Sequence, residues 1–375
     1  MLKIIYVTDA LMLGGVETQL VDLILRLDRS RFEPFVVCLY GPRARDNYFQ
    51  KPLTQAGVPV YMLDRMWGAT DKLQIINDLR GIFHSIQPDI IQPENYHSNL
   101  LARLAKFGFG KAKFIGTQRT VYTQKQLRYE KWGSRFADTI VVSAEHLKTQ
   151  LTQHVDIPAQ KIQIIHNAID VQRFAHPQKI LARTDILPKN SRMLLSLGRI
   201  SRQKRMDLIC DALHTLQSQS KPNPNWNILI VGPIQDEDSQ RALMEKRAKY
   251  HLEDYITILP GTDTPEAYYA ACDATILFST DESYPCVMME SLAAGKPLII
   301  SEEANAAMVV EHKKTGWAVP THNIATFAES IADFYAISDT ELAEMKTAAC
   351  QRGQFFGIDR LVQEYERLYQ NLKNS

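Results

Sequence analysis

The stretch that most directly indicates the fold is Ser279-Thr-Asp-Glu-Ser-Tyr-Pro-Cys-Val-Met-Met-Glu-Ser-Leu-Ala-Ala-Gly-Lys-Pro297. It follows an apolar run at 274–278 that is typical of a buried strand, and it passes through a turn at Pro285. Apolar side chains then recur at helical spacing until Gly295, which predicts a helix after the turn. A strand, a turn and a helix in this order are typical of a doubly wound parallel sheet.

Two glutamates stand eight residues apart in this stretch. Glu282 falls in the predicted loop, and Glu290 falls in the opening turn of the predicted helix, so both face the crevice where doubly wound sheets bind ligands. Carboxylates accept hydrogen bonds from sugar hydroxyls, and the N–H groups of a helix N-terminus bind phosphate. The pattern therefore favours a nucleotide-sugar site, although two solvated glutamates at an ordinary strand–helix corner would show the same spacing.

Length, charge and cysteine content limit the classes of protein to consider. A chain of 375 residues exceeds what one hydrophobic core usually serves, so we expect two domains. A formal net charge of +1 argues against nucleic acid as a partner. The five cysteines lack the spacing of disulfide or zinc frameworks, which indicates reduced thiols, a cytoplasmic location and no metal site. Residues 1–13 lack a signal-peptide cleavage site, and no stretch is apolar enough to span a bilayer.

Strand-like and helix-like patterns alternate in both halves of the chain. In the first half, apolar runs predict strands at 3–8, 35–39, 60–63, 90–92, 113–117, 139–142 and 162–165. The pattern restarts after a polar passage at 175–190, with predicted strands at 193–197, 227–231, 256–259, 274–278 and 297–301. This alternation predicts an α/β fold of two Rossmann-like domains, each a doubly wound parallel sheet, facing each other across a ligand-binding cleft.

Two glycine turns are suitably placed to hold a diphosphate. Gly198 ends the first strand of the second half, and Arg199 and Lys204 follow it. A guanidinium and an ammonium form a sensible pair for phosphate oxygens, with a solvated basic turn as the alternative. Gly14 and Gly15 lie between the first strand and the first helix, where paired glycines let the backbone approach an anion closely.

The motifs together resemble those of the retaining glycosyltransferases of family 4, which have the two-domain GT-B fold, and in particular bacterial enzymes that build surface polysaccharides and glycolipids. The matching segments are Gly14-Gly-Val-Glu17, Val141-Val-Ser-Ala-Glu145, Ile165-His-Asn-Ala-Ile-Asp-Val-Gln-Arg-Phe174, Gly198-Arg199 with Lys204, Tyr269-Ala-Ala-Cys-Asp273, and the pair Glu282 and Glu290. They follow the order of the family's motifs over most of the chain.

The resemblance implies transfer of a hexosyl or N-acetylhexosaminyl group from a UDP- or GDP-linked sugar to a hydroxyl of a lipid-linked, polysaccharide or other glycan acceptor. Configuration would be retained, without a metal or other cofactor. Glu282 would act at the donor sugar and Glu290 at the ribose, while Arg199 and Lys204 would neutralise the leaving diphosphate. Further donor contacts would come from Gly14, Gly15, Ser283, Tyr284, Pro285, Cys286 and Val287.

The first half departs from the family pattern. Many members carry a His-x-His pair where this chain has Gln92-Pro-Glu94, and a further histidine where it has Gln118-Arg119. His97 matches a second histidine of some bacterial enzymes and is our candidate catalytic histidine, with a capping or core role as the alternative. The missing histidines keep two other functions open, namely a non-catalytic sugar-nucleotide-binding protein and a sugar-nucleotide epimerase of the same fold.

Two segments bear on partners and on domain organisation. Residues 103–136 carry nine basic residues, one acid and interleaved aromatic residues. This pattern fits either peripheral contact with the inner membrane face or a solvated basic face whose aromatic side chains lie in the core. An amphipathic pattern at 358–372 predicts a last helix that returns to the first domain. We therefore expect an acceptor domain at 1–175, completed by a helix at 355–373, and a donor domain at 190–350.

Overall fold

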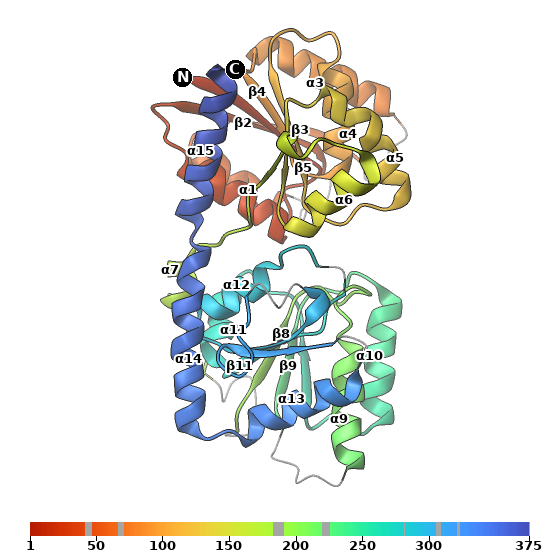
Figure 1. Ribbon diagram of the computed structural model, residues 1–375, viewed down its shortest axis with the longest axis vertical. Helices are drawn as coiled ribbons and strands as arrows, with labels where there is room; N and C mark the ends of the chain where they lie inside the picture. The colour runs from red at the N-terminus through yellow and green to blue at the C-terminus, as the bar shows by residue number, and fades with distance from the viewer. Residues whose placement is uncertain are drawn as a thin grey trace. The chain divides into compact units, whose positions relative to one another are not determined.

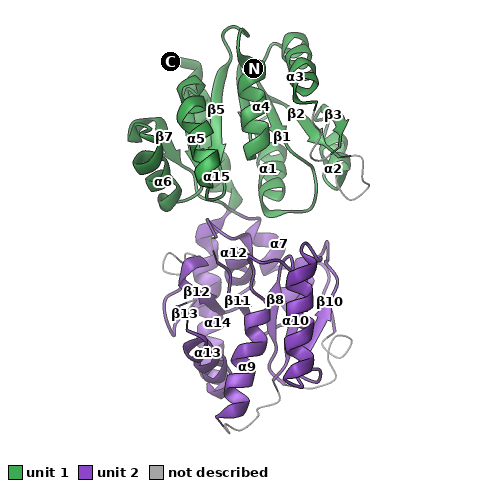
Figure 2. Cartoon of the chain, turned by 90° about the vertical axis from the view of Figure 1, so that its right-hand side faces the viewer, with its two compact units in different colours: residues 1–168, 358–375 green, residues 169–357 purple. Residues whose placement is uncertain are grey.

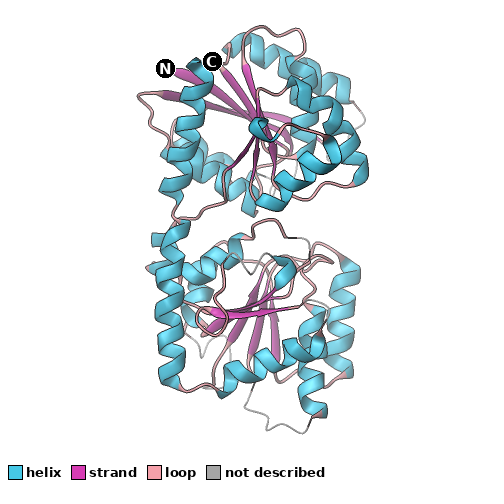
Figure 3. Cartoon of the chain, viewed as in Figure 1, coloured by secondary structure: helices cyan, strands magenta, loops and turns pink. Residues whose placement is uncertain are grey.

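The computed structural model describes residues 1–41, 47–66, 71–182, 191–219, 226–280, 282–304, 309–320 and 323–374. The chain forms two compact units, unit 1 with residues 1–168 and 358–375 and unit 2 with residues 169–357 (Figure 2). Each unit is a parallel sheet with helices on both faces (Figures 1 and 3). This is the fold class predicted from the sequence. The acceptor and donor roles of the two units stay predictions.

Unit 1 contains a seven-stranded sheet in the order β3-β2-β1-β4-β5-β6-β7, and every pair of neighbours is parallel. The strands are β1 (Leu2–Thr8), β2 (Phe32–Tyr40), β3 (Val60–Arg65), β4 (Ile90–Pro93), β5 (Lys113–Gln118), β6 (Thr139–Val142) and β7 (Ile162–Ile164). The helices are α1 (Gly15–Arg26), α2 (Gln50–Gln55), α3 (Lys72–Ile86), α4 (Tyr96–Lys106), α5 (Gln124–Gly133), α6 (Glu145–Val155) and α15 (Ile358–Asn374). Each strand overlaps a run predicted for the first half.

The first strand, β1, shows why the strands of unit 1 have continuously apolar sequences. Successive side chains of a strand point to opposite faces. Ile4 and Tyr6 lie in the core cluster that includes α1 and α15 residues, whereas Ile5 and Val7 lie in the cluster that includes α3 and α4 residues. Helices therefore cover both faces of the sheet, so the side chains on both sides of the strand are apolar.

The last helix, α15, belongs to unit 1 although it follows unit 2 in the sequence. Leu361, Tyr365 and Leu368 recur at helical spacing and are buried in the same core cluster as α1 residues. Tyr369 packs edge-on against Phe32 with ring centroids 5.8 Å apart. The apolar stripe of this helix is thus what returns the end of the chain to the first sheet.

Unit 2 contains a six-stranded parallel sheet in the order β10-β9-β8-β11-β12-β13. Its strands are β8 (Leu194–Leu197), β9 (Ile228–Val231), β10 (Ile256–Leu259), β11 (Ala274–Leu277), β12 (Leu298–Ser301) and β13 (Gly316–Val319). Its helices are α7 (Val171–Ala175), α9 (Asp207–Ser218), α10 (Glu237–Lys249), α11 (Pro265–Ala271), α12 (Cys286–Ala293), α13 (Ile324–Ala336) and α14 (Asp339–Gly353). The sequence patterns missed β13, because it is short and begins with a glycine.

The observed division of the chain differs from the predicted linker. Unit 1 ends at Ala168, and α7 packs against α11 and α12 within unit 2. Of the polar passage at 175–190, residues 183–190 lie outside the described residues. The linker was predicted from the polarity of this passage alone. The boundary of the units is set instead by the packing of α7, which precedes the passage and belongs to unit 2. No helix in the described part of the chain is long and apolar enough to cross a membrane.

Candidate functional site

A glycine turn shapes the carboxyl edge of the sheet in unit 2. Gly198 follows β8 with φ +143°, a conformation that favours glycine. Its N–H donates to the carbonyl of Val231 at 3.0 Å, which continues the pairing of β8 with β9. A side chain at Gly232 would overlap the carbonyl of Gly198. Two glycines in contact therefore let the turn after β8 lie directly against the end of β9.

The turn brings Lys204 to Glu282, two of the residues predicted for the site. The N–H of Thr280 donates to the carbonyl of Gln203 at 2.9 Å, which ties the turn to the loop after β11. Nζ of Lys204 then lies 2.6 Å from Oε1 of Glu282, and the two side chains are 10% and 11% exposed. The strands β8 and β11 are neighbours in the sheet, so their carboxyl ends place these charges together.

Arg199 lies on the same turn as Lys204 but does not join this pair. Its side chain is exposed, and no hydrogen bond or ion pair links it to another described residue. The guanidinium is thus open to solvent at the same edge of the sheet. An anion that approached this edge would find it without displacing an internal partner.

Glu290 lies in the second turn of α12, one turn later than the sequence pattern indicated. Its Oε2 accepts a hydrogen bond from the hydroxyl of Tyr269 on α11 at 2.9 Å. Burial raises the pKa of Glu290 to about 7, and the bond from Tyr269 and the charges of Arg173 and Lys204 oppose this rise. Phe174 packs edge-on against the ring of Tyr269 at 5.7 Å. The carboxyl is therefore held by a buried aromatic support from α7 and α11.

The remaining predicted donor residues form the entry to α12. Ser283, Tyr284 and Pro285 are buried, and Pro285 is the N-cap of the helix. Cys286 and Val287 are half-buried in its first turn. Glu282 and Glu290 thus lie on either side of a helix N-terminus, where an anion is stabilised by the helix dipole.

An apolar pocket of about 200 Å³ lies next to the glycine turn. Its lining includes Ile200, Ile234 and Leu259, together with Gly232 and Pro260. These residues come from the carboxyl ends of β8, β9 and β10. A planar aromatic ring would find apolar walls here, close to the turn that carries Arg199 and Lys204.

The acidic sequence Asp236-Glu-Asp238 takes no part in this edge. Asp236 is the N-cap of α10 and accepts hydrogen bonds from the N–H of Asp238 and the hydroxyl of Ser239. Asp238 pairs with Arg241 on the same helix. Both aspartates thus stabilise the start of the helix. Within the described ranges, no three His, Cys, Asp or Glu residues are grouped to hold a metal ion.

In unit 1, His97 lies at the carboxyl edge of the sheet. Its Nδ1 is 3.6 Å from Oδ2 of Asp9, which follows β1, and half of its side chain is exposed. The contact with the Asp9 carboxylate raises the pKa of His97 above its usual value, against a smaller opposing effect of burial. Oδ1 of Asp9 also accepts the N–H of Ser98 at 2.8 Å in the first turn of α4. His97 is therefore oriented by an acid that itself holds the helix start.

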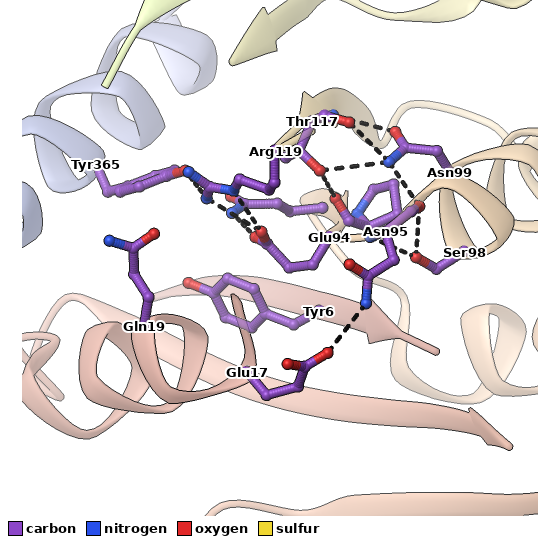
Figure 4. A network of polar contacts seen from close by, with 12 residues as sticks. Tyr6, Glu17, Gln19, Glu94, Asn95, Ser98, Asn99, Thr117, Arg119 and Tyr365 are labelled. Carbon is purple, nitrogen blue, oxygen red and sulfur yellow. Dashed lines mark hydrogen bonds and ion pairs between the residues drawn. The ribbon is translucent and has the colours of Figure 1, made fainter. Parts of the chain in front are cut away.

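The glycines at the start of α1 have an acidic neighbour. Gly14 is the N-cap of this helix, and the carboxylate of Glu17 in the first turn lies close to its Cα. Oε1 of Glu17 also accepts a hydrogen bond from the side chain of Asn95 at 3.4 Å (Figure 4). A negative charge at this helix N-terminus favours hydroxyl groups over phosphate. The predicted donor contacts of Gly14 and Gly15 stay predictions.

A buried ion pair joins Glu94 and Arg119, which stand at positions where the resemblance implies histidines. Nε and Nη2 of Arg119 donate to Oε2 of Glu94 at 3.1 and 3.0 Å (Figure 4). Nη2 of Arg119 also reaches the hydroxyl of Tyr365 on α15 at 2.6 Å, and the amide of Gln92 donates to Oε1 of Glu94 at 2.6 Å. The side chains of Arg119 and Glu94 are 5% and 1% exposed. Gln92, Glu94 and Arg119, which stand in place of histidines, thus contact one another within unit 1.

Two family descriptions match the chain, one on each half. Glycosyltransferase Family 4 matches residues 13–173, and Glycosyl transferases group 1 matches residues 179–352. The D-inositol 3-phosphate glycosyltransferase of Jonesia denitrificans is 27% identical over 225 residues, which cover 57% of this chain and 52% of that protein. An uncharacterized glycosyltransferase of Haemophilus influenzae is 25% identical over 194 residues, 51% of this chain and 53% of that protein. The chain thus spans about half the length of these curated relatives.

Solved structures show the same fold over the whole chain. Anabaena HepE in complex with UDP and glucose superposes with a TM-score of 0.82 at 20% identity, covering 99% of this chain and 100% of that one. Sucrose-phosphate synthase from Thermosynechococcus elongatus superposes with a TM-score of 0.82 at 16% identity, covering 100% of both chains. At these identities the likeness is one of fold.

Proposed function

Since the chain belongs to glycosyltransferase family 4, we propose that it transfers a hexosyl or N-acetylhexosaminyl group from a nucleoside-diphosphate sugar to a hydroxyl of a glycan or lipid-linked acceptor. In this reaction the acceptor oxygen forms a bond to the anomeric carbon as the bond to the diphosphate breaks. Configuration is retained, as the family resemblance implies. The donor is a UDP- or GDP-linked sugar. A uridine nucleotide is the first choice, because HepE of the same fold was solved with UDP and glucose.

The observation that carries the proposal is the arrangement of charges around α12 in unit 2. Glu282 and Glu290 lie on either side of the helix N-terminus, with Lys204 on one carboxylate and Tyr269 on the other. Two carboxylates suit the hydroxyls of a donor sugar and a ribose, and the cations suit a diphosphate. The apolar pocket beside the glycine turn suits a nucleobase.

Leaving-group stabilisation in this proposal comes from side chains and not from a divalent metal. Arg199 and Lys204 stand on the turn after β8, where negative charge develops on the departing diphosphate. Lys204 exchanges Glu282 for phosphate oxygens when the donor binds. Glu282 is then released toward the donor sugar. The acceptor is bound by unit 1, where His97, Asp9 and Glu17 offer groups for hydroxyls.

Donor binding and turnover test this proposal directly. Thermal-shift screening against UDP- and GDP-linked sugars identifies the donor, and isothermal titration measures its affinity. Glu290→Gln and Arg199→Gln are each expected to weaken donor binding at least tenfold, which is about 1.4 kcal/mol. The matched controls are Glu344→Gln on α14 and Arg241→Gln on α10, both on exposed surface of unit 2. They should leave the affinity unchanged.

Turnover separates the enzyme from the two other functions. Donor hydrolysis or transfer that persists in EDTA and is lost in Glu282→Gln supports a metal-independent transferase. Donor binding without turnover on any acceptor would instead indicate a sugar-nucleotide-binding protein. Release of a free epimerised sugar without an acceptor would indicate an epimerase. Activity that requires added Mg²⁺ would contradict the metal-independent reaction.

A further inference from the structure

The segment 103–136 contributes only positive charge to the surface of unit 1. Its single acid, Glu130, is buried and accepts two hydrogen bonds from Arg103 at 2.8 and 2.7 Å. Arg119 is likewise buried against Glu94. On α5 and the 3-10 turn that follows it (Ser134–Phe136), the exposed charged residues are Lys125, Arg128, Lys131 and Arg135. The buried pairs therefore remove the acid of this segment from the surface. Two acids outside the segment pair with its lysines, Asp138 with Lys106 and Lys113 and Asp156 with Lys131.

Large aromatic side chains are exposed on the same face. Phe107 and Trp132 are each 68% exposed, and Phe136 is 42% exposed. The ring of Phe136 contacts both of the others, with centroids 6.0 Å from Phe107 and 5.8 Å from Trp132. The three rings thus form one continuous apolar ridge that joins the end of α4 to the end of α5. Tyr122, which is 5% exposed, lies in the core, as the alternative interpretation of this segment predicted. The three rings of the ridge do not.

An aromatic ridge surrounded by basic residues needs a partner that is apolar and anionic at once. Water satisfies the basic groups but not the exposed rings, whose burial is favourable in proportion to their area. The boundary between lipid headgroups and acyl chains satisfies both, because aromatic rings lie at the headgroup level while lysine and arginine bind anionic headgroups. Arg128 and Arg135 flank Tyr129 and Trp132 closely in sequence, so charge and ring would reach the boundary together.

We propose that this aromatic–basic surface, made of Phe107, Trp132 and Phe136 with Lys125, Arg128 and Arg135, binds the surface of an anionic lipid bilayer. Lys131 is left out of the definition because it pairs with Asp156 at 2.8 Å. The aromatic rings enter the headgroup layer, and the three basic residues contact lipid phosphates. The binding is independent of the proposed glycosyl transfer, since none of these residues belongs to the candidate site.

Co-sedimentation of the full chain with vesicles tests the proposal. Vesicles of phosphatidylcholine with about 30% phosphatidylglycerol are compared with vesicles of phosphatidylcholine alone, at 0.1 and 0.5 M NaCl. The wild-type chain is expected to sediment with the anionic vesicles and not with the neutral ones. The higher salt concentration should weaken the binding, because it screens exposed charges.

Surface variants assign the binding to this face. Each basic residue near an anionic surface contributes about fivefold to the partition coefficient, so Lys125→Gln/Arg128→Gln/Arg135→Gln should lose about a hundredfold. The matched control is Lys51→Gln/Lys179→Gln/Lys249→Gln, which removes three exposed lysines elsewhere and gives the same net charge. Phe107→Ser/Trp132→Ser should also lose binding, whereas Leu73→Ser, at a residue 79% exposed on α3, should not.

Tryptophan fluorescence gives a readout that does not depend on sedimentation. Of the four tryptophans, Trp226 and Trp317 are buried at 1% and 2% exposure, and Trp67 lies outside the described residues. A blue shift on adding anionic vesicles is expected from Trp132, and it should vanish in Trp132→Phe, which leaves the other three tryptophans in place. Equal binding to neutral and anionic vesicles, no binding to either, or an equal loss in the control triple variant would overturn the proposal. A dimer in solution that Phe107→Ser/Trp132→Ser converts to a monomer, without vesicle binding, would assign the ridge to a second copy instead.

Discussion

The ammonium of Lys204 lies 2.6 Å from the carboxylate of Glu282, although the two residues belong to loops that follow different strands. Both side chains are about nine-tenths buried. A buried pair of this kind compensates the desolvation of each charge only while both partners are present. In the proposed function, donor binding exchanges this contact for contacts with phosphate and sugar, so each charge keeps a partner throughout.

A double-mutant cycle measures how strongly these two residues are coupled. Lys204→Gln alone leaves a buried carboxylate without its cation, and we expect a loss of about 3 kcal/mol in the free energy of unfolding. Lys204→Gln/Glu282→Gln should be less destabilised than the sum of the single variants by at least about 1 kcal/mol, measured by urea denaturation. The more accessible pair Arg26–Asp22 on α1, with side chains 30% and 24% exposed, is the control, with a coupling of at most about 0.5 kcal/mol. Equal couplings would contradict the structural role of burial.

The raised pKa of Glu290 makes stability depend on pH. Folding moves this pKa from 4.5 to about 7, so the folded chain holds a proton that the unfolded chain releases between these values. The free energy of unfolding should therefore fall as pH rises from 4.5 to 7, by about 1 kcal/mol per pH unit. Glu290→Gln should flatten this part of the profile, measured by urea denaturation at several pH values. An unchanged slope would mean that another group causes it.

Tyr269 should set the pH at which a nucleotide binds. Its hydroxyl donates to the Glu290 carboxylate, and this bond lowers the pKa of that carboxyl. Tyr269→Phe should therefore raise the pKa further and move the midpoint of UDP affinity to higher pH. The control is Tyr335→Phe, since the Tyr335 hydroxyl is also buried in unit 2 but donates to the Asn227 carbonyl. Isothermal titration between pH 6 and 9 measures both.

Asp9 should keep His97 protonated at higher pH than an isolated histidine. The raised pKa means that the pair stabilises the fold at low pH and loses this effect as pH rises through the folded value. Asp9→Asn should return the pKa of His97 toward 6.5, measured by NMR titration of the ring protons. His146, whose pKa is lowered by burial, is the internal control and should not change. If the pKa of His97 were the same in Asp9→Asn as in the wild-type chain, the contact between Asp9 and His97 would be excluded.

The ion pair of Glu94 and Arg119 should be essential to unit 1 but replaceable as a pair. Arg119→Met leaves the Glu94 carboxylate buried without a cation, so we expect a loss of about 3–5 kcal/mol in the free energy of unfolding. Glu94→Gln/Arg119→Met removes both charges and should recover much of that loss. The side-chain amide oxygen introduced by Glu94→Gln can still accept the hydrogen bond that the side-chain amide of Gln92 donates. Guanidinium denaturation of the three proteins decides this, and a double variant as unstable as the single one would contradict it.

Two glycines with opposite surroundings predict opposite effects of alanine. A Cβ at Gly232 would overlap the carbonyl of Gly198, so Gly232→Ala should displace the glycine turn and cost about 1–3 kcal/mol. Gly81, in the middle of α3, has nothing within 4 Å of the same atom. Gly81→Ala should instead stabilise the chain by about 0.5–1 kcal/mol. Thermal denaturation measures both, and the donor affinity should fall only in Gly232→Ala.

The parallel sheets can be predicted from the order of residues alone, because a strand covered on both faces must be apolar throughout and each helix must keep one apolar stripe. The sequence also placed Lys204 and Glu282 in loops after strands and Glu290 in the helix that follows, because the order of strand, turn and helix fixes which segment carries each residue. The strand β13 was not predicted from the sequence, because a run of four residues that begins with Gly316 has too little apolar pattern.

Which charged side chains pair with one another becomes visible only in the folded chain. Contacts such as that of Arg119 with Glu94 and Tyr365 join residues 25 and 246 positions apart, and no local periodicity encodes such pairings. The same holds for Glu130, whose burial against Arg103 means that the charged side chains that residues 103–136 contribute to the surface are all basic. Periodicity records which side of an element faces the core, whereas ion pairs depend on how separate elements pack, and that packing exists only in the folded chain.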